Sequence, residues 1–213
     1  MTRSPTRRQL LVDALAGAGA LSLASSVACA TPRPGAAPAP TGPAGAALPI
    51  GDVHDFDFFV GEWNGANRRL KKRWVRSDDW EEFPGYHRCE SRMGGVVNLT
   101  DVAFPTKGWS GMTVRTFDLE KRQWHLYWIS SKTGRLFPPL IGGFTGERGE
   151  FYGHDTDDGR PVHVRYVWTR PSPDVARWEQ AFSLDGRQWE INWTVEKTRV
   201  KPVTAAGLGA AGT

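Results

Sequence analysis

The sequence predicts an all-β domain, a single antiparallel up-and-down closed barrel of about ten strands. Runs of alternating apolar and polar residues follow one another along the chain, and turns containing Gly, Asp or Pro separate them at the spacing typical of hairpins. No stretch of useful length has the 3.6-residue period of a helix. Closure is favoured over a sandwich, because a closed sheet leaves no unpaired edge strand that could aggregate.

Each strand is expected where such a run lies between two turns. The expected strands are residues 61–74, 80–92, 95–104, 109–117, 123–131, 140–147, 150–156, 161–170, 175–184 and 188–199. Asp185-Gly186-Arg187 is typical of the turns, because Gly reaches positive φ without a steric penalty. Pro138 and Pro139 cannot donate ladder hydrogen bonds, so segment 130–141 is expected to form a loop at one mouth of the barrel.

The N-terminal part of the chain predicts export. Arg7 and Arg8 precede an almost wholly apolar stretch that ends at Ala30, which is typical of a twin-arginine-type export signal over residues 1–30. Two endings of this signal stay open: cleavage after Ala30, or lipidation of Cys29, which would give the protein a lipid anchor in a membrane. Either ending predicts an exported protein that is periplasmic, on the cell surface or secreted.

Composition divides the rest of the chain into three parts. Residues 31–51 are rich in Pro, Ala and Gly and predict a linker, residues 52–200 predict the barrel, and residues 201–213 predict a disordered tail. The net charge of +4 falls to +2 without the signal, which contains three Arg and one Asp. The basic run from Arg68 to Arg76 is therefore interpreted as a solvated strand edge, and no nucleic acid is expected as a partner.

Residue types that would mark a metal, a cofactor or a catalytic centre are sparse. Cys89 is the one cysteine outside the signal and is expected to be buried and inert. The five His show no metal-ligand spacing, and no phosphate- or dinucleotide-binding motif occurs, so neither a metal nor a cofactor is expected. The acid–base candidates are His154 with Asp155 near a hairpin rim, and Glu179 with His125 on strands expected to be neighbours.

The two ends of the predicted barrel carry a recognisable pattern. The opening run HDFDFFVGEW at residues 54–63 ends in Gly61-Glu62-Trp63, and the closing run 189–199 begins WEINW and ends in Arg199. In this respect residues 54–199 resemble a bacterial family of lipocalin-like (calycin) domains of unknown function, whose opening strand has the pattern HDFDF-x-VG-x-W. The resemblance implies a barrel in which Trp63 packs against Arg199. It informs the fold far more than the function.

Period-2 alternation separates an inward from an outward face on each strand. The predicted inward residues of the later strands are Trp124, Leu126, Trp128, Val162, Val164, Tyr166, Trp168, Trp178, Gln180, Phe182, Trp189, Ile191, Trp193 and Val195. The alternate residues, Asn192 among them, are polar or charged and are expected outside.

The first strand allows two interpretations. Counting from Trp63 places Asn67 and Arg69 inward, where they would be polar anchors of an otherwise apolar pocket. The alternative is a β-bulge after Gly65 that turns Leu70 inward and Arg69 outward, since an unpaired buried charge is costly.

The sequence therefore predicts an exported lipocalin-like barrel that binds a small hydrophobic or aromatic ligand, with an anionic head if Arg69 faces inward. The predicted ligand-binding residues are Asn67, Arg69, Trp124, Trp128, Tyr166, Trp168, Trp178, Gln180, Phe182 and Trp193. The alternative is a cofactor-free enzyme on the same barrel, an isomerase, cyclase or hydratase that acts on such a molecule.

Overall fold

The structure is a computed structural model and describes residue 42 and residues 45–200. The expected export signal with Cys29, most of the expected linker and the expected tail of 201–213 lie outside the described residues. Within the described part of the chain, no helix has the length and apolar character that crossing a membrane requires.

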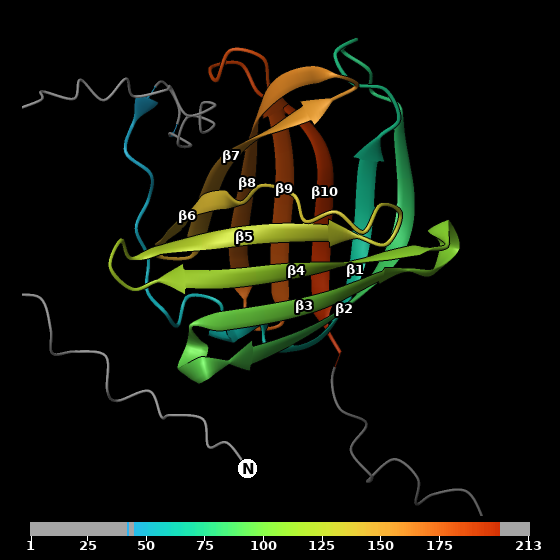
Figure 1. The fold of residues 1–213 in the computed structure, drawn as a ribbon. Coiled ribbons are helices and arrows are strands. Elements are labelled where there is room, and N and C mark those ends of the chain that lie inside the picture. The colour runs from blue at the N-terminus through green and yellow to red at the C-terminus, as the bar shows by residue number, and fades with distance from the viewer. Residues whose placement is uncertain (1–41, 43–44, 201–213) are drawn as a thin grey trace, which may run out of the picture. The chain divides into compact units, whose positions relative to one another are not determined.

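Ten antiparallel strands form one closed barrel, as the alternation predicted (Figure 1). The strands are β1 (Gly61–Leu70), β2 (Trp80–Arg92), β3 (Val97–Phe104), β4 (Trp109–Asp118), β5 (Gln123–Ser130), β6 (Leu140–Thr145), β7 (Arg148–Asp157), β8 (Arg160–Ser172), β9 (Val175–Ser183) and β10 (Glu190–Arg199). Each strand pairs with its neighbours in sequence, and β1 pairs with β10 to close the sheet. Three short 3₁₀ turns join them: η2 (Asp57–Phe59), η3 (Met93–Gly95) and η4 (Pro105–Lys107).

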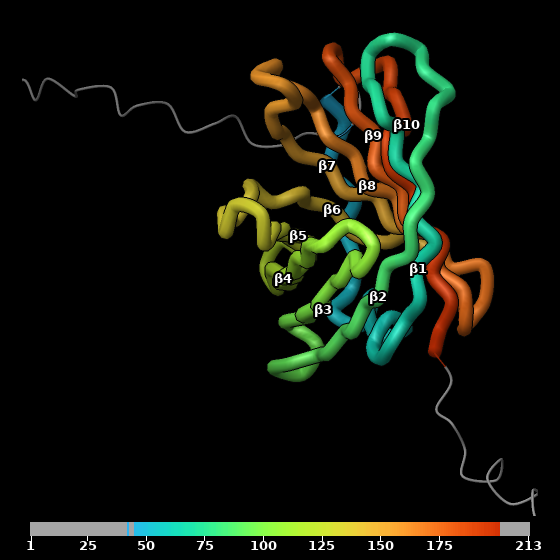
Figure 2. Tube along the Cα trace, turned by 90° about the vertical axis from the view of Figure 1, so that its right-hand side faces the viewer, coloured from blue at the N-terminus to red at the C-terminus, as the bar shows by residue number. Residues whose placement is uncertain are grey.

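The barrel is flattened into two walls. Strands β3, β4 and β5 lie on one side and β8, β9 and β10 on the other (Figure 2). The strands of the two walls cross at a steep angle (Figure 1). This crossing follows from the right-handed twist that accumulates around a closed sheet.

The segment that precedes β1 fills one end of the barrel, here called the closed end. Phe56 and Phe59 are fully buried, and Phe56 makes edge contacts with Trp124 and Trp168 at ring-centroid distances of 5.0 and 5.7 Å. Phe59 stacks on Trp63 with ring centroids 5.2 Å apart. Aromatic rings bury the largest area per side chain, so this segment supplies much of the core.

Trp63 and Arg199 hold the closed end together across the β1–β10 seam. They are register partners, and the Arg199 guanidinium carbon lies 4.2 Å from the centroid of the fully buried Trp63 ring. Arg199 Nη1 donates to the carbonyl of Val60 at 2.8 Å, and Trp63 Nε1 donates to the carbonyl of Phe59 at 2.9 Å. One cation–π pair thus fixes both the last strand and the segment before the first.

The last strand differs from the prediction. A β-bulge shifts the β9–β10 register between Ile191 and Trp193, so Asn192 is buried and Ile191 is 39% exposed. Trp189 packs instead on Tyr152, with ring centroids 6.1 Å apart, and under the guanidinium of Arg165. The prediction that Trp189 and Ile191 face inward was therefore wrong, because one extra residue reverses the alternation.

Trp63→Ala is expected to lower the free energy of unfolding by about 3–5 kcal/mol, because it leaves a cavity and removes the ring beneath Arg199. Chemical denaturation followed by circular dichroism measures the loss. Leu119→Ala is the control, because Leu119 is 67% exposed in a turn. A loss no larger than that of the control would contradict the role of Trp63.

Candidate functional site

The interior above the closed end holds a cavity of about 250 Å³. Its wall is rich in aromatic side chains, with Trp128, Trp168, Trp178 and Trp193 among the lining residues. The rings contact one another edge-on: Trp178 lies 5.8 Å from Trp193 and 4.9 Å from Tyr166, centroid to centroid. Such a wall is typical of sites for small molecules with rings or apolar chains.

Eight of the ten predicted ligand-binding residues line this cavity: Asn67, Trp128, Tyr166, Trp168, Trp178, Gln180, Phe182 and Trp193. Two polar pairs orient the wall. Trp193 Nε1 donates to Asn67 Oδ1 at 3.1 Å, and Gln180 Nε2 donates to Asn192 Oδ1 at 2.8 Å.

Trp124 does not line the cavity. It is fully buried at the closed end, and its Nε1 donates to the carbonyl of Asp52 at 3.0 Å. Phe56 occupies the space between Trp124 and the cavity wall at Trp168. Trp124 is therefore a core residue, and its assignment to the ligand site was wrong.

Arg69 does not line the cavity either. The pairing of β1 with β2 is unbroken from Gly61 to Leu70, so the proposed β-bulge is absent. The Arg69 guanidinium lies 5.2 Å from the Trp193 ring centroid, and Nη2 lies 2.6 Å from Glu81 Oε1. Glu81 pairs with both Arg69 and Lys107 at the rim, so the expectation that Arg69 is a polar anchor inside the pocket is not met.

Three other nitrogen groups, absent from the predicted site, line the cavity near the closed end: His87 of β2, Arg115 of β4 and Lys197 of β10. Their exposed fractions are 5%, 2% and 3%. Alternation could have revealed Lys197, because it lies two residues beyond the inward Val195.

Arg115 is held by neutral groups only. Its Nη1 donates to Asn98 Oδ1 at 2.6 Å and to Thr100 Oγ1 at 2.7 Å, and its guanidinium carbon lies 4.7 Å from the Phe56 ring centroid. Among the described residues no carboxylate pairs with it. Burial lowers the pKa of Arg115 to about 10, so the guanidinium keeps its charge at neutral pH.

Lys197 has aromatic neighbours in place of a counter-ion. Its Nζ lies 4.6 Å from the Trp168 ring centroid and 5.5 Å from that of Trp178. It makes no hydrogen bond and no ion pair with any described residue. Burial, and then the charge of Arg115, hold the pKa of Lys197 well below its usual value, which favours the neutral amine.

His87 is buried beside these two groups. Its Nε2 has no hydrogen-bond partner among the described residues, and a Cβ placed on Gly65 would lie only 2.7 Å from it. The imidazole therefore occupies the space that a side chain at Gly65 would fill. Burial, then the charges of Lys197 and Arg115, hold the pKa of His87 well below its usual value.

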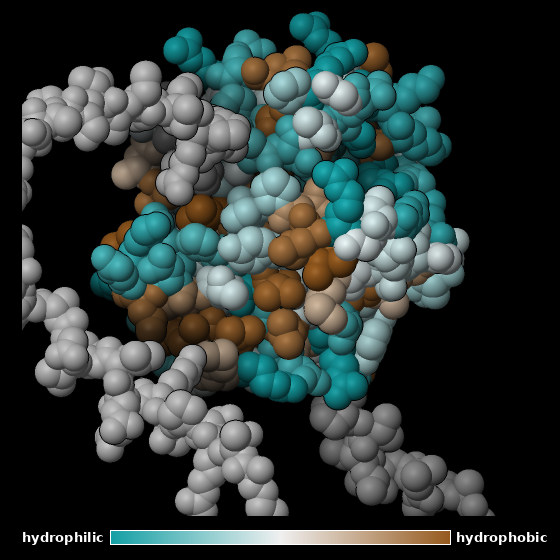
Figure 3. Space-filling view, in the orientation of Figure 1, coloured by the Kyte–Doolittle hydropathy of each residue, from teal (hydrophilic) through white to brown (hydrophobic). Residues whose placement is uncertain are grey.

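The cavity reaches the surface at the segment between β5 and β6. These two strands pair at three positions only, Trp124 to Leu126, and the segment between them adds a single isolated bridge, Leu136 with Ile129. Pro138 in this segment is exposed and also lines the cavity. Apolar residues gather at the centre of this face, where Figure 1 shows the segment crossing the barrel (Figure 3).

The acid–base candidates differ in position. His154 and Asp155 line the cavity, and burial raises the pKa of Asp155. Glu179 and His125 lie on β9 and β5, which are not neighbours, so their expected pairing was wrong.

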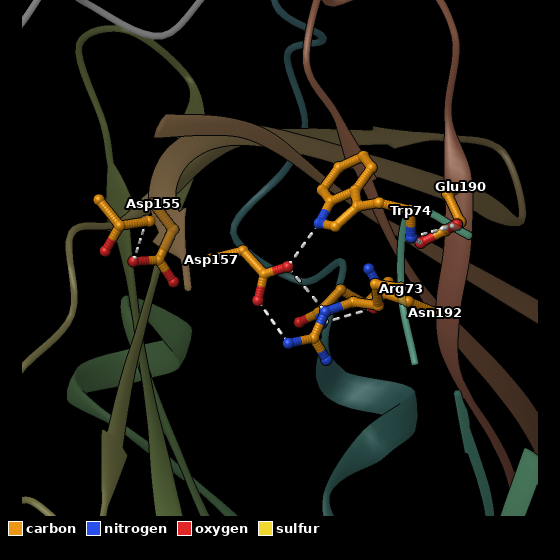
Figure 4. Close-up of polar contacts among 8 residues, drawn as sticks. Arg73, Trp74, Asp155, Asp157, Glu190 and Asn192 are labelled. Atoms are coloured by element: carbon orange, nitrogen blue, oxygen red, sulfur yellow. Dashed lines mark hydrogen bonds and ion pairs between the residues drawn. The ribbon is translucent and has the colours of Figure 1, made fainter. Parts of the chain in front are cut away.

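The loop 71–79 between β1 and β2 covers the barrel where β1 ends. The side chains of Arg73 and Trp74 both point at Asp157 (Figure 4). Arg73 Nε donates to Asp157 Oδ2 at 2.9 Å and Trp74 Nε1 at 2.8 Å, while the Trp74 backbone N–H donates to Glu190 at 2.9 Å. Arg73 also lies over the ring of the cavity residue Phe182.

Searches of protein-family models and of curated proteins found no match to this chain. The lipocalin-like resemblance therefore stays a prediction at the level of family. Within the described residues, no three His, Cys, Asp or Glu side chains converge as a metal site would need.

His87 should make stability depend on pH. Between its low folded pKa and about 6.5, the unfolded chain binds a proton at this residue and the folded chain does not. The free energy of unfolding should therefore fall as pH drops below about 6.5, with a slope from this group of at most about 1.4 kcal/mol per pH unit. Urea denaturation between about pH 5 and 8, the range in which histidine titrates, measures this dependence.

His87→Gln should flatten this dependence relative to the natural protein. His54→Gln is the matched control, because the His54 side chain is 66% exposed. Equal slopes for the natural protein and His87→Gln would contradict the assignment.

Asp157→Asn should loosen the loop 71–79, because the charge that Arg73 and Trp74 share is lost. Amide hydrogen exchange of peptides from this loop should become at least about fivefold faster. Asp79→Asn is the control, since Asp79 pairs with Lys71 at the surface of the same loop. Unchanged exchange in Asp157→Asn would show that this ion pair does not hold the loop.

Proposed function

We propose that this protein is exported and that its barrel, lipocalin-like as the resemblance implies, binds a small hydrophobic or aromatic molecule with an anionic head. The apolar part of the ligand lies among the tryptophans of the cavity wall. The head lies deeper, at Arg115. Access is from the segment between β5 and β6, where the exposed Pro138 lines the cavity.

The observation that carries this proposal is the unneutralised charge of Arg115. A buried charge without a counter-ion is costly, and a protein keeps one where a function requires it. Asn98 and Thr100 fix one nitrogen of the guanidinium and supply no negative charge. A carboxylate or similar anion would complete the site, because charge-assisted hydrogen bonds to a planar guanidinium are strong and directional.

The wall supports selection by shape. Trp193 is tied to Asn67, and Gln180 is tied to Asn192, so two of the groups that face the ligand are held before it arrives. A wall that needs no reordering gives up less affinity to conformational entropy. The volume of about 250 Å³ suits a molecule with one or two rings.

A cofactor-free isomerase, cyclase or hydratase is the second candidate. The observation that favours it is that the unpartnered His87 Nε2 and the carboxyl of Asp155 both line the cavity. A neutral imidazole can accept a proton, and a carboxyl whose pKa is raised by burial can donate one. Chemical turnover of a bound compound, abolished by His87→Gln, would decide for the enzyme.

Isothermal titration with 4-phenylbutanoate and its primary amide tests the binding proposal. The two probes match in size and differ in charge. The carboxylate should bind more tightly by about 1.5–3 kcal/mol, because its partner is a buried guanidinium. Intrinsic tryptophan fluorescence should change with both probes, since each must contact the wall.

Arg115→Met should remove the preference for the carboxylate. Arg69→Met is the matched control and should keep it, since Arg69 pairs with Glu81 at the rim and does not line the cavity. If Arg115→Met does not fold, the comparison of the two probes on the natural protein still decides. Equal affinities of acid and amide would contradict the anionic head, and no binding by a broad set of apolar compounds would contradict the ligand site.

A further inference from the structure

Lys197 is the buried group that anion binding at Arg115 does not explain. Its β-sheet partners are Gly65 on β1 and Ala176 on β9, so small side chains flank it on both sides. The flexible lysine stem is thus free of bulky neighbours within the sheet, and its amine lies at the rings of Trp168 and Trp178, which line the cavity.

The charged and titratable groups around this amine are all of one kind. Arg115 of β4 acts on this amine electrostatically, and Lys197 and Arg115 both act on His87 of β2. Asp155 of β7 also lines the cavity. Its carboxyl is influenced by burial, Thr156, Arg135 and Asp157, and it is not among the groups that act on Lys197. Among the described residues, no negative charge therefore acts on this amine, and only aromatic rings would stabilise its ammonium form when the cavity is empty.

A lysine in such a place is suited to covalent chemistry. An amine is a nucleophile only when it has lost its proton, and desolvation beside another cation is the usual means of achieving this near neutral pH. Lysine amines of this kind react with carbonyl compounds to form imines.

We propose that Lys197 captures an aldehyde or ketone ligand as an imine inside the barrel. This inference rests on the proposed function, because the carbonyl compound must enter the same cavity. A ligand with an apolar body and a carbonyl group near one end would lie among the tryptophans with its carbonyl carbon at Nζ. A carboxylate on the same molecule would be held by Arg115.

The reaction needs no oxidant and no cofactor. The Nζ lone pair attacks the carbonyl carbon, the C–N bond forms, the C=O π bond breaks, and one proton moves from nitrogen to oxygen to give a carbinolamine. The C–O bond then breaks, a second proton passes from nitrogen to the departing oxygen, and one water leaves. The products are the imine of Lys197 and water.

His87 is the group placed to move these protons. Its Nε2 has no partner and lies over Gly65, the register partner of Lys197. A neutral imidazole can accept a proton from the attacking amine and return it to the departing oxygen.

Reductive trapping tests the proposal directly. The folded protein is treated with 3-phenylpropanal and sodium cyanoborohydride, and peptide mapping by mass spectrometry locates the reduced adduct. Lys197 should be labelled at least about tenfold faster than the surface lysines at pH near 7, because those amines are protonated there. In the unfolded protein this preference should disappear.

Lys197→Met should lose the fast label, and Lys107→Met, which changes a lysine paired with Glu81 at the rim, should retain it. His87→Gln should slow adduct formation at Lys197 and shift its pH profile. If Lys197→Met fails to fold, the labelling preference within the natural protein remains a complete test.

Titration with the unreactive alcohol 3-phenylpropanol separates this inference from the proposed function. If the alcohol binds but the aldehyde labels Lys197 no faster than the surface lysines, imine capture is overturned and ligand binding stands. If neither the alcohol nor 4-phenylbutanoate binds, both proposals fall. A selective adduct at Lys197, slowed by competing 4-phenylbutanoate, supports both.

Discussion

Closure of the sheet between β1 and β10 is the constraint on which the rest of the molecule depends. The seam runs in unbroken antiparallel register from the Trp63–Arg199 pair to the Arg69–Trp193 pair. Once it is closed, alternate residues of every strand must share one interior, whatever their polarity. The same seam therefore produces the aromatic core, the cavity wall and the inward position of Lys197, two residues before the arginine that stacks on Trp63.

How far the N-terminal segment reaches into the barrel decides which part of the interior is packed core and which part is cavity. Phe56 and Phe59 fill the closed end with ring contacts, and the cavity begins directly above them, where Arg115 and Lys197 lie. Filling that space with apolar side chains would bury more surface without leaving charges unpaired. The sequence instead carries Arg115 and Lys197 there, with no carboxylate among the described residues paired to either, and this polar arrangement is less stabilising than an apolar filling would be.

The openings of the barrel follow from backbone chemistry. Pro138 and Pro139 cannot complete a ladder, so β5 and β6 separate after three pairs and leave an apolar opening. At the end of β1 the loop 71–79 is fixed by charge instead, through Arg73 on Asp157. The opening between β5 and β6 thus results from missing backbone donors. The loop 71–79 is held by the Arg73–Asp157 ion pair, and a substitution in the loop or at Asp157 would release it.

The sequence by itself determined the number and order of the strands, the closed up-and-down topology and most of the aromatic wall, because alternation and turn chemistry are local and hairpins join neighbours in sequence. The expected range of the first strand, 61–74, was wrong at its end, because β1 stops at Leu70 and residues 71–74 belong to the loop 71–79. Only the tertiary structure decided which inward residues meet the cavity. Trp124 became core because Phe56 lies above it, and Arg69 became part of an ion pair at the rim because Glu81 lies opposite on β2. The cluster of Arg115 and Lys197 joins β4 and β10, which are not neighbours in the sheet, and alternation carries no information about which residues converge across a barrel.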